Sequence, residues 1–329
     1  MLKMKIAVDA MGGDFSPVEI VKGAVKAVEK GYAEIILVGD ETQINKELTK
    51  YPKLPGLTIF HATEVIQMDE SPAIAARKKR DSSMVVGIKL VKENVVQGFV
   101  SAGSTGAQMA ASIMYLGRIK NIHRPAIVTL MPTLQGAKVL LDVGATVDSK
   151  PEDLLQFAHM GSLYAEKILS FNEPTVGLIN IGTEKNKGNQ LTQEAYSLLA
   201  GSTLNFFGNL ETRDIPKGLV DVMVCDGFIG NAILKFAEGI ASAFGQLLKD
   251  EINSNIFTKI SALPLLPGLK RINNKFDYSE YGGAPLLGVN GISIICHGSS
   301  NATAICNAIK TAVQCNEVNL VGAINLVND

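Results

Sequence analysis

Short runs of apolar, mostly β-branched residues recur along this chain, and segments with helical periodicity separate them. The runs lie at residues 5–8, 35–38, 57–60, 95–100, 127–130, 139–142, 176–180, 204–207, 221–225 and 292–296. Most of them are followed by Gly, Asp, Asn or Ser and then by a helical pattern. In residues 17–30, for example, the valine and alanine side chains at positions 18, 21, 24, 25 and 28 fall on one face. The pattern predicts strands and helices in alternation.

The runs are continuous rather than alternating, which is typical of strands that are buried on both faces. Alternating strands and helices form parallel sheets through right-handed crossovers. We therefore predict an α/β fold with three layers around a doubly wound, mostly parallel sheet. The chain shows no repeat and no linker, and its best candidate boundary, at residues 149–151, is weak. We predict a single α/β domain over residues 1–329, with two domains sharing one sheet as the alternative.

Residues 252–272 depart from this rhythm because apolar, basic and proline residues are mixed there. Pro264 and Pro267 argue against one continuous helix. We predict a protruding pair of helices with an apolar tip, an amphipathic insertion at about 250–278. It either inserts shallowly into a membrane or forms a dimer interface, and both alternatives stay open. The predicted membrane contacts are Phe257, Leu263, Leu265 and Leu266.

Three glycine-rich loops follow apolar runs and open helical patterns, at residues 101–106, 180–189 and 297–301. Such loops expose backbone N–H groups, and a helix start favours negative charge, so each is a candidate anion site. In open α/β sheets, ligands bind at the carboxyl ends of strands, where these loops fall. The set predicts an enzyme that handles phosphate.

Two of these loops supply the candidate phosphate ligands. Lys185 and Lys187 can neutralise a phosphate and a developing oxyanion. The backbone and hydroxyl candidates are Gly103, Ser104, Thr105, Gly106, Gly188 and Asn189. The alternatives are that Ser104 is only a helix N-cap and that residues 180–189 form a solvated surface loop.

Other turns constrain the chemistry. Residues 9–14 lack the GxGxxG spacing of a dinucleotide site, so we predict no NAD, and a tight turn between strand and helix is the alternative. Asp226 is the predicted N-cap of the helix that carries Asn231. Cys225 fits a buried structural thiol better than a nucleophile. His297 ends a strand and either contacts an anion or a leaving group or is structural.

A basic run, formed by Arg77, Lys78, Lys79 and Arg80, ends a helical pattern. It is either a solvated helix end that complements the helix dipole or a dock for an acidic partner.

Composition narrows the class of protein. The chain has 329 residues, 47% of them hydrophobic and 19% charged, with a net charge of −1, which favours a globular protein and argues against a nucleic-acid binder. No signal-peptide pattern precedes residue 6, and no apolar stretch reaches the ~20 residues of a membrane span, so we expect a cytoplasmic protein. The four cysteines lack CxxC spacing, and the four histidines are scattered. We therefore expect reduced thiols, no metal and no cofactor.

Taken together, these motifs resemble the PlsX-type phosphate acyltransferases of bacterial phospholipid synthesis. The matching stretches cover nearly the whole chain in order. They are residues 8–14, 69–72, 101–106, 124–126, 141–145, 156–158, 180–189, 205–209, 225–231, 281–288 and 297–298.

The resemblance implies that a long-chain acyl group moves from acyl carrier protein (ACP) to inorganic phosphate, which gives acyl phosphate. It also implies a fold similar to phosphotransacetylases and to isocitrate and isopropylmalate dehydrogenases, a homodimer, and peripheral membrane association. A membrane glycerol-3-phosphate acyltransferase is a possible downstream partner. The rival hypotheses are a phosphotransacetylase-like enzyme that uses acyl-CoA, and a non-enzymatic membrane scaffold.

Within this family reaction, our hypothesis assigns roles to the candidate residues. Lys185, Lys187 and the loop at 101–106 hold phosphate. Asn231 and His297 orient the thioester carbonyl or the leaving sulfur. The basic run at 77–80 docks ACP, which is acidic.

Overall fold

A computed structural model describes residues 4–265, 267–269 and 282–327 and shows an α/β protein with two sheets. The larger sheet has the strand order β3-β2-β1-β4-β12-β11-β5. Its strands are β1 (Lys5–Asp9), β2 (Glu34–Gly39), β3 (Leu57–His61), β4 (Gly98–Ser101), β5 (Ala126–Ile127), β11 (Ala284–Leu287) and β12 (Ile292–Ile295). β1, β2, β3, β4 and β12 are parallel, whereas β11 is antiparallel to both β12 and β5.

The smaller sheet has the order β6-β7-β10-β8-β9. Its strands are β6 (Thr129–Thr133), β7 (Gly136–Leu141), β8 (Val176–Asn180), β9 (Phe206–Glu211) and β10 (Val222–Val224). β6 and β7 form an antiparallel hairpin, and the remaining pairs are parallel.

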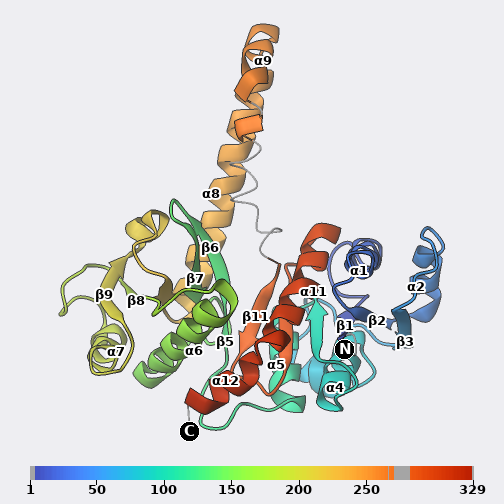
Figure 1. Cartoon of the computed structure of the whole chain (residues 1–329), viewed down its shortest axis with the longest axis horizontal. Coiled ribbons are helices and arrows are strands. Elements are labelled where there is room, and N and C mark those ends of the chain that lie inside the picture. The colour runs from blue at the N-terminus through green and yellow to red at the C-terminus, as the bar shows by residue number, and fades with distance from the viewer. Residues whose placement is uncertain (1–3, 266, 270–281, 328–329) are drawn as a thin grey trace.

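Helices cover both faces of each sheet (Figure 1). On the larger sheet, α1 and α11 pack on one face, and α4 and α5 pack on the other. On the smaller sheet, α6 and α7 pack on one face, and η1 and the first turns of α8 pack on the other. The bounds are α1 (Val18–Glu29), α2 (Glu41–Leu48), α3 (Pro72–Lys78), α4 (Ser83–Lys92), α5 (Thr105–Tyr115), α6 (Pro151–Leu169), α7 (Gln190–Ala200), α8 (Gly227–Asn253), α9 (Ile256–Ala262), α11 (Ala302–Glu317) and α12 (Leu320–Val327), with 3₁₀ turns η1 (Thr212–Lys217) and η2 (Leu263–Leu265).

Successive residues of the strands face two different hydrophobic cores. Ile6 and Val8 of β1 belong to the core with α1 and α11, whereas Ala7 belongs to the core with α4 and α5. Both cores continue into the smaller sheet, where Leu141 joins the first and Leu140 joins the second. Strands buried on both faces explain the continuous apolar runs of the sequence.

The prediction of an α/β fold with mostly parallel strands is confirmed, but the prediction of one sheet is wrong. Each predicted apolar run overlaps a strand. The hairpin of β6 and β7 begins the second sheet just after β5. Apolar runs do not encode which strands pair, so the division into two sheets is a tertiary property.

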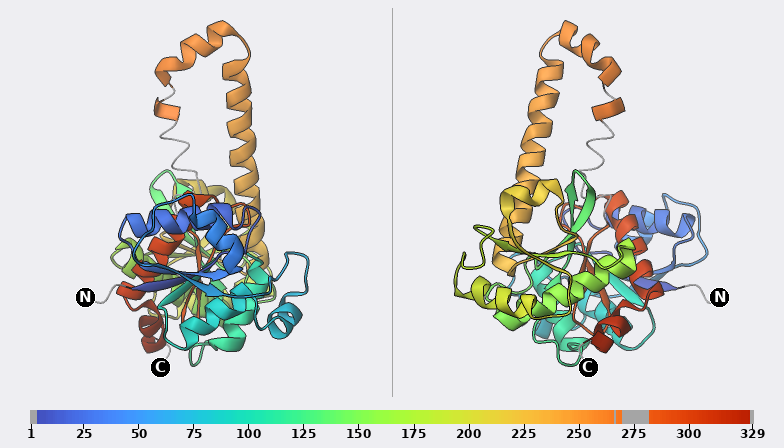
Figure 2. Two further views of the ribbon diagram at one scale, coloured as in Figure 1. Left: turned by 90° about the vertical axis from the view of Figure 1, so that its right-hand side faces the viewer. Right: turned by 60° about the vertical axis from the view of Figure 1, so that its left-hand side comes forward.

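The protruding segment begins earlier than the sequence indicated. α8 is one helix of 27 residues, and only Gly227 and Gly230 are buried among them. It projects away from the body, with α9 near its far end (Figures 1 and 2). The break between α8 and α9 falls at Ser254 and Asn255 rather than at the prolines, and Asn255 caps α9. Part of the predicted insertion, residues 266 and 270–278, lies outside the described residues.

Candidate functional site

The carboxyl ends of β1 and β4 lie side by side where the strand order changes direction, the position at which open α/β sheets form a ligand crevice. From β1 the chain runs outward through β2 and β3, and β4 then pairs with the opposite side of β1. Ser101 at the end of β4 donates a 2.7 Å hydrogen bond to Oδ2 of Asp9 at the end of β1. The same hydroxyl accepts the Gly103 N–H at 3.0 Å. This is the topological switch point at which open α/β sheets bind ligands.

Glycine is required in the turn that closes this crevice. A Cβ on Gly12 would lie 2.5 Å from Oδ2 of Asp9 and 2.8 Å from the backbone nitrogen of Gly103. Burial raises the pKa of the Asp9 carboxyl, although hydrogen bonds from Ser83, Ser101 and the turn oppose that rise. The tight-turn interpretation of residues 9–14 is therefore confirmed, and the turn holds a buried carboxyl against the candidate phosphate loop.

Two side chains of the loop at 101–106 have different roles: Ser104 caps a helix, and Thr105 is exposed. Ser104 is the N-cap of α5, since its hydroxyl accepts the Ala107 N–H at 3.4 Å. Ser104 is thus an N-cap, and its role as a phosphate ligand stays a prediction. Thr105 is exposed at the first position of α5, and Gly106 lies against Pro72, which a Cβ would approach to 2.9 Å. The positive end of α5 faces the same edge of the sheet.

The loop at 181–189 follows β8 and is braced by two buried asparagines. Nδ2 of Asn180 donates to the Lys187 carbonyl at 3.1 Å and to Oδ1 of Asn209 at 3.1 Å. Nδ2 of Asn209 in turn donates to the Glu184 carbonyl at 2.8 Å. Gly188 has a φ of +93° and packs against Asn180, so no side chain fits there. The loop is internally fixed even though its lysines are exposed.

The two lysines of this loop have separate neighbours. Nζ of Lys187 lies 4.0 Å from a carboxylate oxygen of Glu184. Nζ of Lys185 lies 5.9 Å from the ring centroid of Tyr196. Asn189 is the N-cap of α7 and accepts the Thr192 N–H at 3.0 Å. In the described part of the chain, no hydrogen bond or ion pair joins Lys185 or Lys187 to the loop at 101–106.

In the smaller sheet, a second buried carboxyl organises the loop after β7. Asp142 accepts four backbone N–H groups, those of Ile127, Gly144, Ala145 and Thr146, at 2.6–3.2 Å. Burial raises the pKa of Asp142, and these hydrogen bonds oppose that rise. This nest of amides was not predicted, because an aspartate after a strand is also a common turn residue.

The first turn of α8 packs directly on this nest. A Cβ on Gly230 would overlap the Asp142 carbonyl oxygen, and one on Gly227 would lie 2.6 Å from Oδ2 of Asp142. Asp226 caps the helix by accepting the Ile229 N–H at 2.8 Å, as the sequence predicted. The side chain of Asn231 lies beside Gly144, whose Cβ position is 3.7 Å from that of Asn231. Cys225 is buried, which raises its pKa, and this confirms it as a structural thiol.

α8 also reaches the loop that follows β12 in the larger sheet. Nζ of Lys235, one helical turn after Asn231, lies 3.3 Å from Nε2 of His297. Nδ1 of His297 lies 2.7 Å from the Ser299 hydroxyl. Next to it, the Gly298 carbonyl accepts the Asp14 N–H at 2.8 Å. Asn231 and His297 are therefore brought to the same stretch of α8, and Lys235, which no sequence motif indicated, stands beside them.

The predicted docking run does not act as one unit. Arg77, Lys78 and Arg80 are exposed at the end of α3. Lys79 instead donates to the Val65 carbonyl at 2.7 Å and pairs with Glu70 at 2.5 Å. Lys79 is therefore only partly exposed, and its ammonium is already paired, whereas the other three cations of the run are exposed.

The projecting segment formed by α8, α9 and η2 is called the arm below. Three of the predicted membrane contacts lie at exposed positions of this arm. Phe257 is 79% exposed, Leu263 55% and Leu265 64%, whereas Leu266 lies outside the described residues. No helix in the described ranges is both long and apolar enough to span a bilayer. Among the same residues, no three His, Cys, Asp or Glu side chains cluster closely enough to hold a metal ion.

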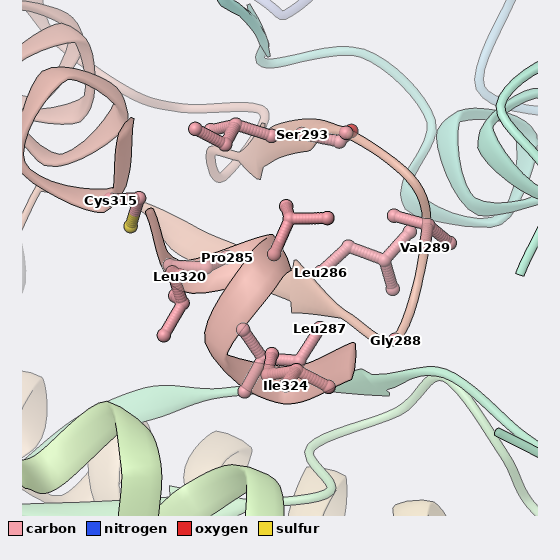
Figure 3. Close-up of a pocket in the computed structure, with 12 residues that line it drawn as sticks. Pro285, Leu286, Leu287, Gly288, Val289, Ser293, Cys315, Leu320 and Ile324 are labelled. Carbon is pink, nitrogen blue, oxygen red and sulfur yellow. The ribbon is translucent and has the colours of Figure 1, made fainter. Parts of the chain in front are cut away.

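A small cavity lies between β11, β12, α11 and α12. Figure 3 shows Leu286, Leu320 and Ile324 around it. Its volume of about 20 Å³ holds one water molecule and no acyl chain.

Comparison with known proteins identifies the family and the fold. A family described as "Fatty acid synthesis protein" matches residues 4–322. The phosphate acyltransferase of Desulfitobacterium hafniense (strain DSM 10664 / DCB-2) is 58% identical over 98% of this chain and 96% of its own length. A phosphotransacetylase from Streptococcus pyogenes covers 96% of this chain and 94% of its own at 21% identity, with a TM-score of 0.65. A 4-hydroxythreonine-4-phosphate dehydrogenase from Klebsiella pneumoniae covers 95% and 98% at 11% identity, with a TM-score of 0.54. The two structures share the fold.

Proposed function

The chain belongs to the fatty acid synthesis protein family as an acyltransferase with phosphate as acceptor, and on that basis we propose that its acyl donor is the thioester of acyl-ACP. A long-chain acyl group would move from the carrier's thiol to inorganic phosphate. The product, acyl phosphate, would feed phospholipid synthesis. The observation that carries this proposal is the presence of candidate anion-binding loops at strand ends in both sheets, supported by the match along nearly the whole chain.

The chemistry needs positioning more than a protein nucleophile. A phosphate oxygen attacks the carbonyl carbon of the thioester and gives a tetrahedral oxyanion, and the C–S bond then breaks. The sulfur leaves as a thiolate, and a thiol pKa of roughly 8.5 makes it a good leaving group. The protein must bring two negatively charged reactants together and stabilise the oxyanion.

We assign phosphate binding to Lys185, Lys187 and the backbone of Gly103, Thr105 and Gly106. The positive end of α5 supports an anion at the second group. Asn231 and His297 would orient the carbonyl or the leaving sulfur, since Asn231 lies in the second turn of α8 and His297, in the loop after β12, contacts Lys235 of the same helix. Closure that brings the loop at 181–189 toward the crevice would complete the site.

ACP would dock on the exposed cations Arg77, Lys78 and Arg80. They lie at the end of α3, whose Pro72 packs against Gly106 of the phosphate loop. An acidic carrier bound there would lie close to the crevice. Opposite charges mainly accelerate encounter and fix orientation.

The arm offers two apolar surfaces that we assign differently. Phe236, Ile240, Phe244 and Leu247 are exposed and lie on one face of α8, the pattern of a helix–helix interface, so we assign them to a homodimer. Phe257, Leu263 and Leu265 at the far end would insert shallowly into a membrane surface. There the apolar product would pass to a membrane glycerol-3-phosphate acyltransferase, the proposed downstream partner of this cytoplasmic, peripherally membrane-associated enzyme.

The first experiment measures release of free thiol from palmitoyl-ACP with and without phosphate, with mass detection of acyl phosphate. Release that requires phosphate and yields acyl phosphate is the expected result. Palmitoyl-CoA at equal concentration is the comparison, because the fold is shared with a phosphotransacetylase. Turnover with palmitoyl-CoA and none with palmitoyl-ACP would overturn the proposed donor.

A further inference from the structure

Three large apolar residues are exposed beyond the ends of neighbouring strands in the smaller sheet. Val147 follows β7, Phe228 follows β10 and Ile181 follows β8, and β10 lies between the other two strands. Val147 is 59% exposed, Phe228 65% and Ile181 81%. None of the three belongs to either hydrophobic core. Exposed apolar residues that gather in one place mark a binding surface.

The backbone brings these residues to the same edge of the sheet. The Gly227 N–H, at the start of α8, donates to the Thr146 carbonyl at 2.9 Å. Val147 and Phe228 are the next residues on the two sides of this hydrogen bond. β8 pairs with β10 in parallel, so both chains leave the sheet at one edge and Ile181 emerges beside the first turn of α8. We call Val147, Ile181 and Phe228 the strand-end surface.

The strand-end surface adjoins residues to which the proposed function already gives a role. Asn231 lies three positions after Phe228 in α8, a spacing that makes two side chains neighbours on a helix. Ile181 directly precedes the loop that carries Lys185 and Lys187. An apolar group attached to a carbonyl at Asn231 would therefore meet the strand-end surface.

The position of the strand-end surface separates it from the two apolar surfaces of the arm. Phe228 is the second residue of α8, at the end that joins the body, whereas the residues assigned to the homodimer begin about two turns later, at Phe236. The residues assigned to the membrane lie at the far end of the arm (Figure 1). An acyl chain whose thioester is held at Asn231 is the apolar occupant that this position fits.

We propose that the strand-end surface binds the hydrocarbon chain of the acyl donor. This inference rests on the proposed function and gives a binding site to the part of the donor that the phosphate ligands and the docking cations leave unassigned. A chain that lies on these side chains removes apolar area of both from water, and the gain grows with each methylene group that is covered. The strand-end surface therefore favours long acyl chains over short ones.

The test compares palmitoyl-ACP with butyryl-ACP as donors for the full-length protein. The measured quantity is the ratio of kcat/KM for the long donor to kcat/KM for the short one. Phe228→Ala should lower this ratio by roughly tenfold, because a covered aromatic side chain is lost to the long chain. Ile181→Ala should lower it as well. The matched control is Phe207→Ala, which removes a 55% exposed phenylalanine near the start of the edge strand β9 and should leave the ratio unchanged.

Binding of product mimics gives a second measurement that needs no turnover. Decylphosphonate and methylphosphonate carry the same anionic group with and without a long chain. By calorimetry, Phe228→Ala should weaken binding of decylphosphonate relative to methylphosphonate by roughly tenfold. An unchanged ratio in either measurement, in a folded protein, would overturn the proposal. A shift of Phe228→Ala to monomer with an unchanged ratio would make the surface a subunit interface instead. If Phe228→Ala fails to fold, Ile181→Ala takes its place.

The two proposals fail in different ways. Decylphosphonate binding that depends on Phe228, without formation of acyl phosphate from palmitoyl-ACP, would retain the strand-end surface and reject the proposed reaction. Formation of acyl phosphate with a chain-length ratio that Phe228→Ala leaves unchanged would retain the reaction and reject the surface.

Discussion

The hydroxyl of Ser101 donates a 2.7 Å hydrogen bond to the buried carboxyl of Asp9 and so joins the ends of β4 and β1. Asp142 holds the corresponding position at the end of β7 in the other sheet. The two carboxyls differ in their partners. Asp9 meets hydroxyls as well as backbone amides, whereas Asp142 meets backbone amides at both oxygens.

This difference predicts unequal responses to amide substitution. In Asp142→Asn, the new NH₂ must face a backbone N–H that cannot reverse its role, so unfolding free energy should fall by about 1–3 kcal/mol. In Asp9→Asn, the NH₂ can face the Ser101 hydroxyl, which can turn and accept, so the loss should be smaller. Urea unfolding of both variants measures the difference. Equal losses would contradict this account of the two carboxyls.

The raised pKa of Asp9 predicts a pH dependence with a definite sign. Because burial favours the protonated carboxyl, its stabilisation is full below the unfolded pKa of about 3.9 and is lost as pH rises through the raised folded pKa. Asp9→Asn removes this loss. The stability of the variant relative to the unmodified protein should therefore increase as the pH rises from the unfolded to the folded pKa of Asp9. Urea midpoints against pH measure it, with exposed Asp148→Asn as control. If the difference in urea midpoint between the two proteins does not change with pH, the raised pKa of Asp9 is contradicted.

Lys187→Ala should raise the phosphate KM by roughly ten- to a hundredfold, because a charged hydrogen bond to phosphate is lost. Lys185→Ala should have a smaller effect, since that ammonium lies over the ring of Tyr196. Initial rates against phosphate concentration measure both. Lys167→Ala, at an exposed ion pair with Glu166, is the matched control. An unchanged phosphate dependence in Lys187→Ala would remove it from the site.

The double variant Arg77→Glu, Lys78→Glu should raise the KM for acyl-ACP by roughly tenfold at low salt and weaken its salt dependence, because encounter with an acidic carrier slows. Lys79 is left in place since it pairs with Glu70. The control, Lys46→Glu with Lys53→Glu, makes the same charge change at exposed positions elsewhere. If both double variants behave alike, the end of α3 is not the dock.

Mutations should distinguish the two proposed functions of the arm, membrane binding and dimerisation. Phe257→Glu with Leu265→Glu should abolish flotation with anionic liposomes and leave the dimer intact. Phe236→Glu with Ile240→Glu should shift sedimentation toward monomer while liposome binding persists. Carboxylates are costly both in a lipid interface and in an apolar helix contact. Loss of the dimer in the first variant would instead make the far end of the arm a subunit interface.

Features that depend on neighbouring residues could be predicted from the sequence. Ser104 and Asp226 were recognisable as caps, because a capping side chain bonds to amides two or three residues ahead. The apolar runs likewise predicted the strands, since a strand that is buried on both faces has apolar side chains at consecutive positions. β11 was missed because its residues 284–287 follow a glycine-rich stretch without a long apolar run.

The sequence by itself determined the α/β class, the strands and caps, and the glycine loops that mark an enzyme of phosphate chemistry. The tertiary structure decided how strands divide into two sheets and which side chains meet. Lys235 and His297 are 62 residues apart, and Asp9 and Ser101 are 92 apart. Local patterns carry no record of such pairs, because strand order and helix packing, rather than chain proximity, bring them within bonding distance.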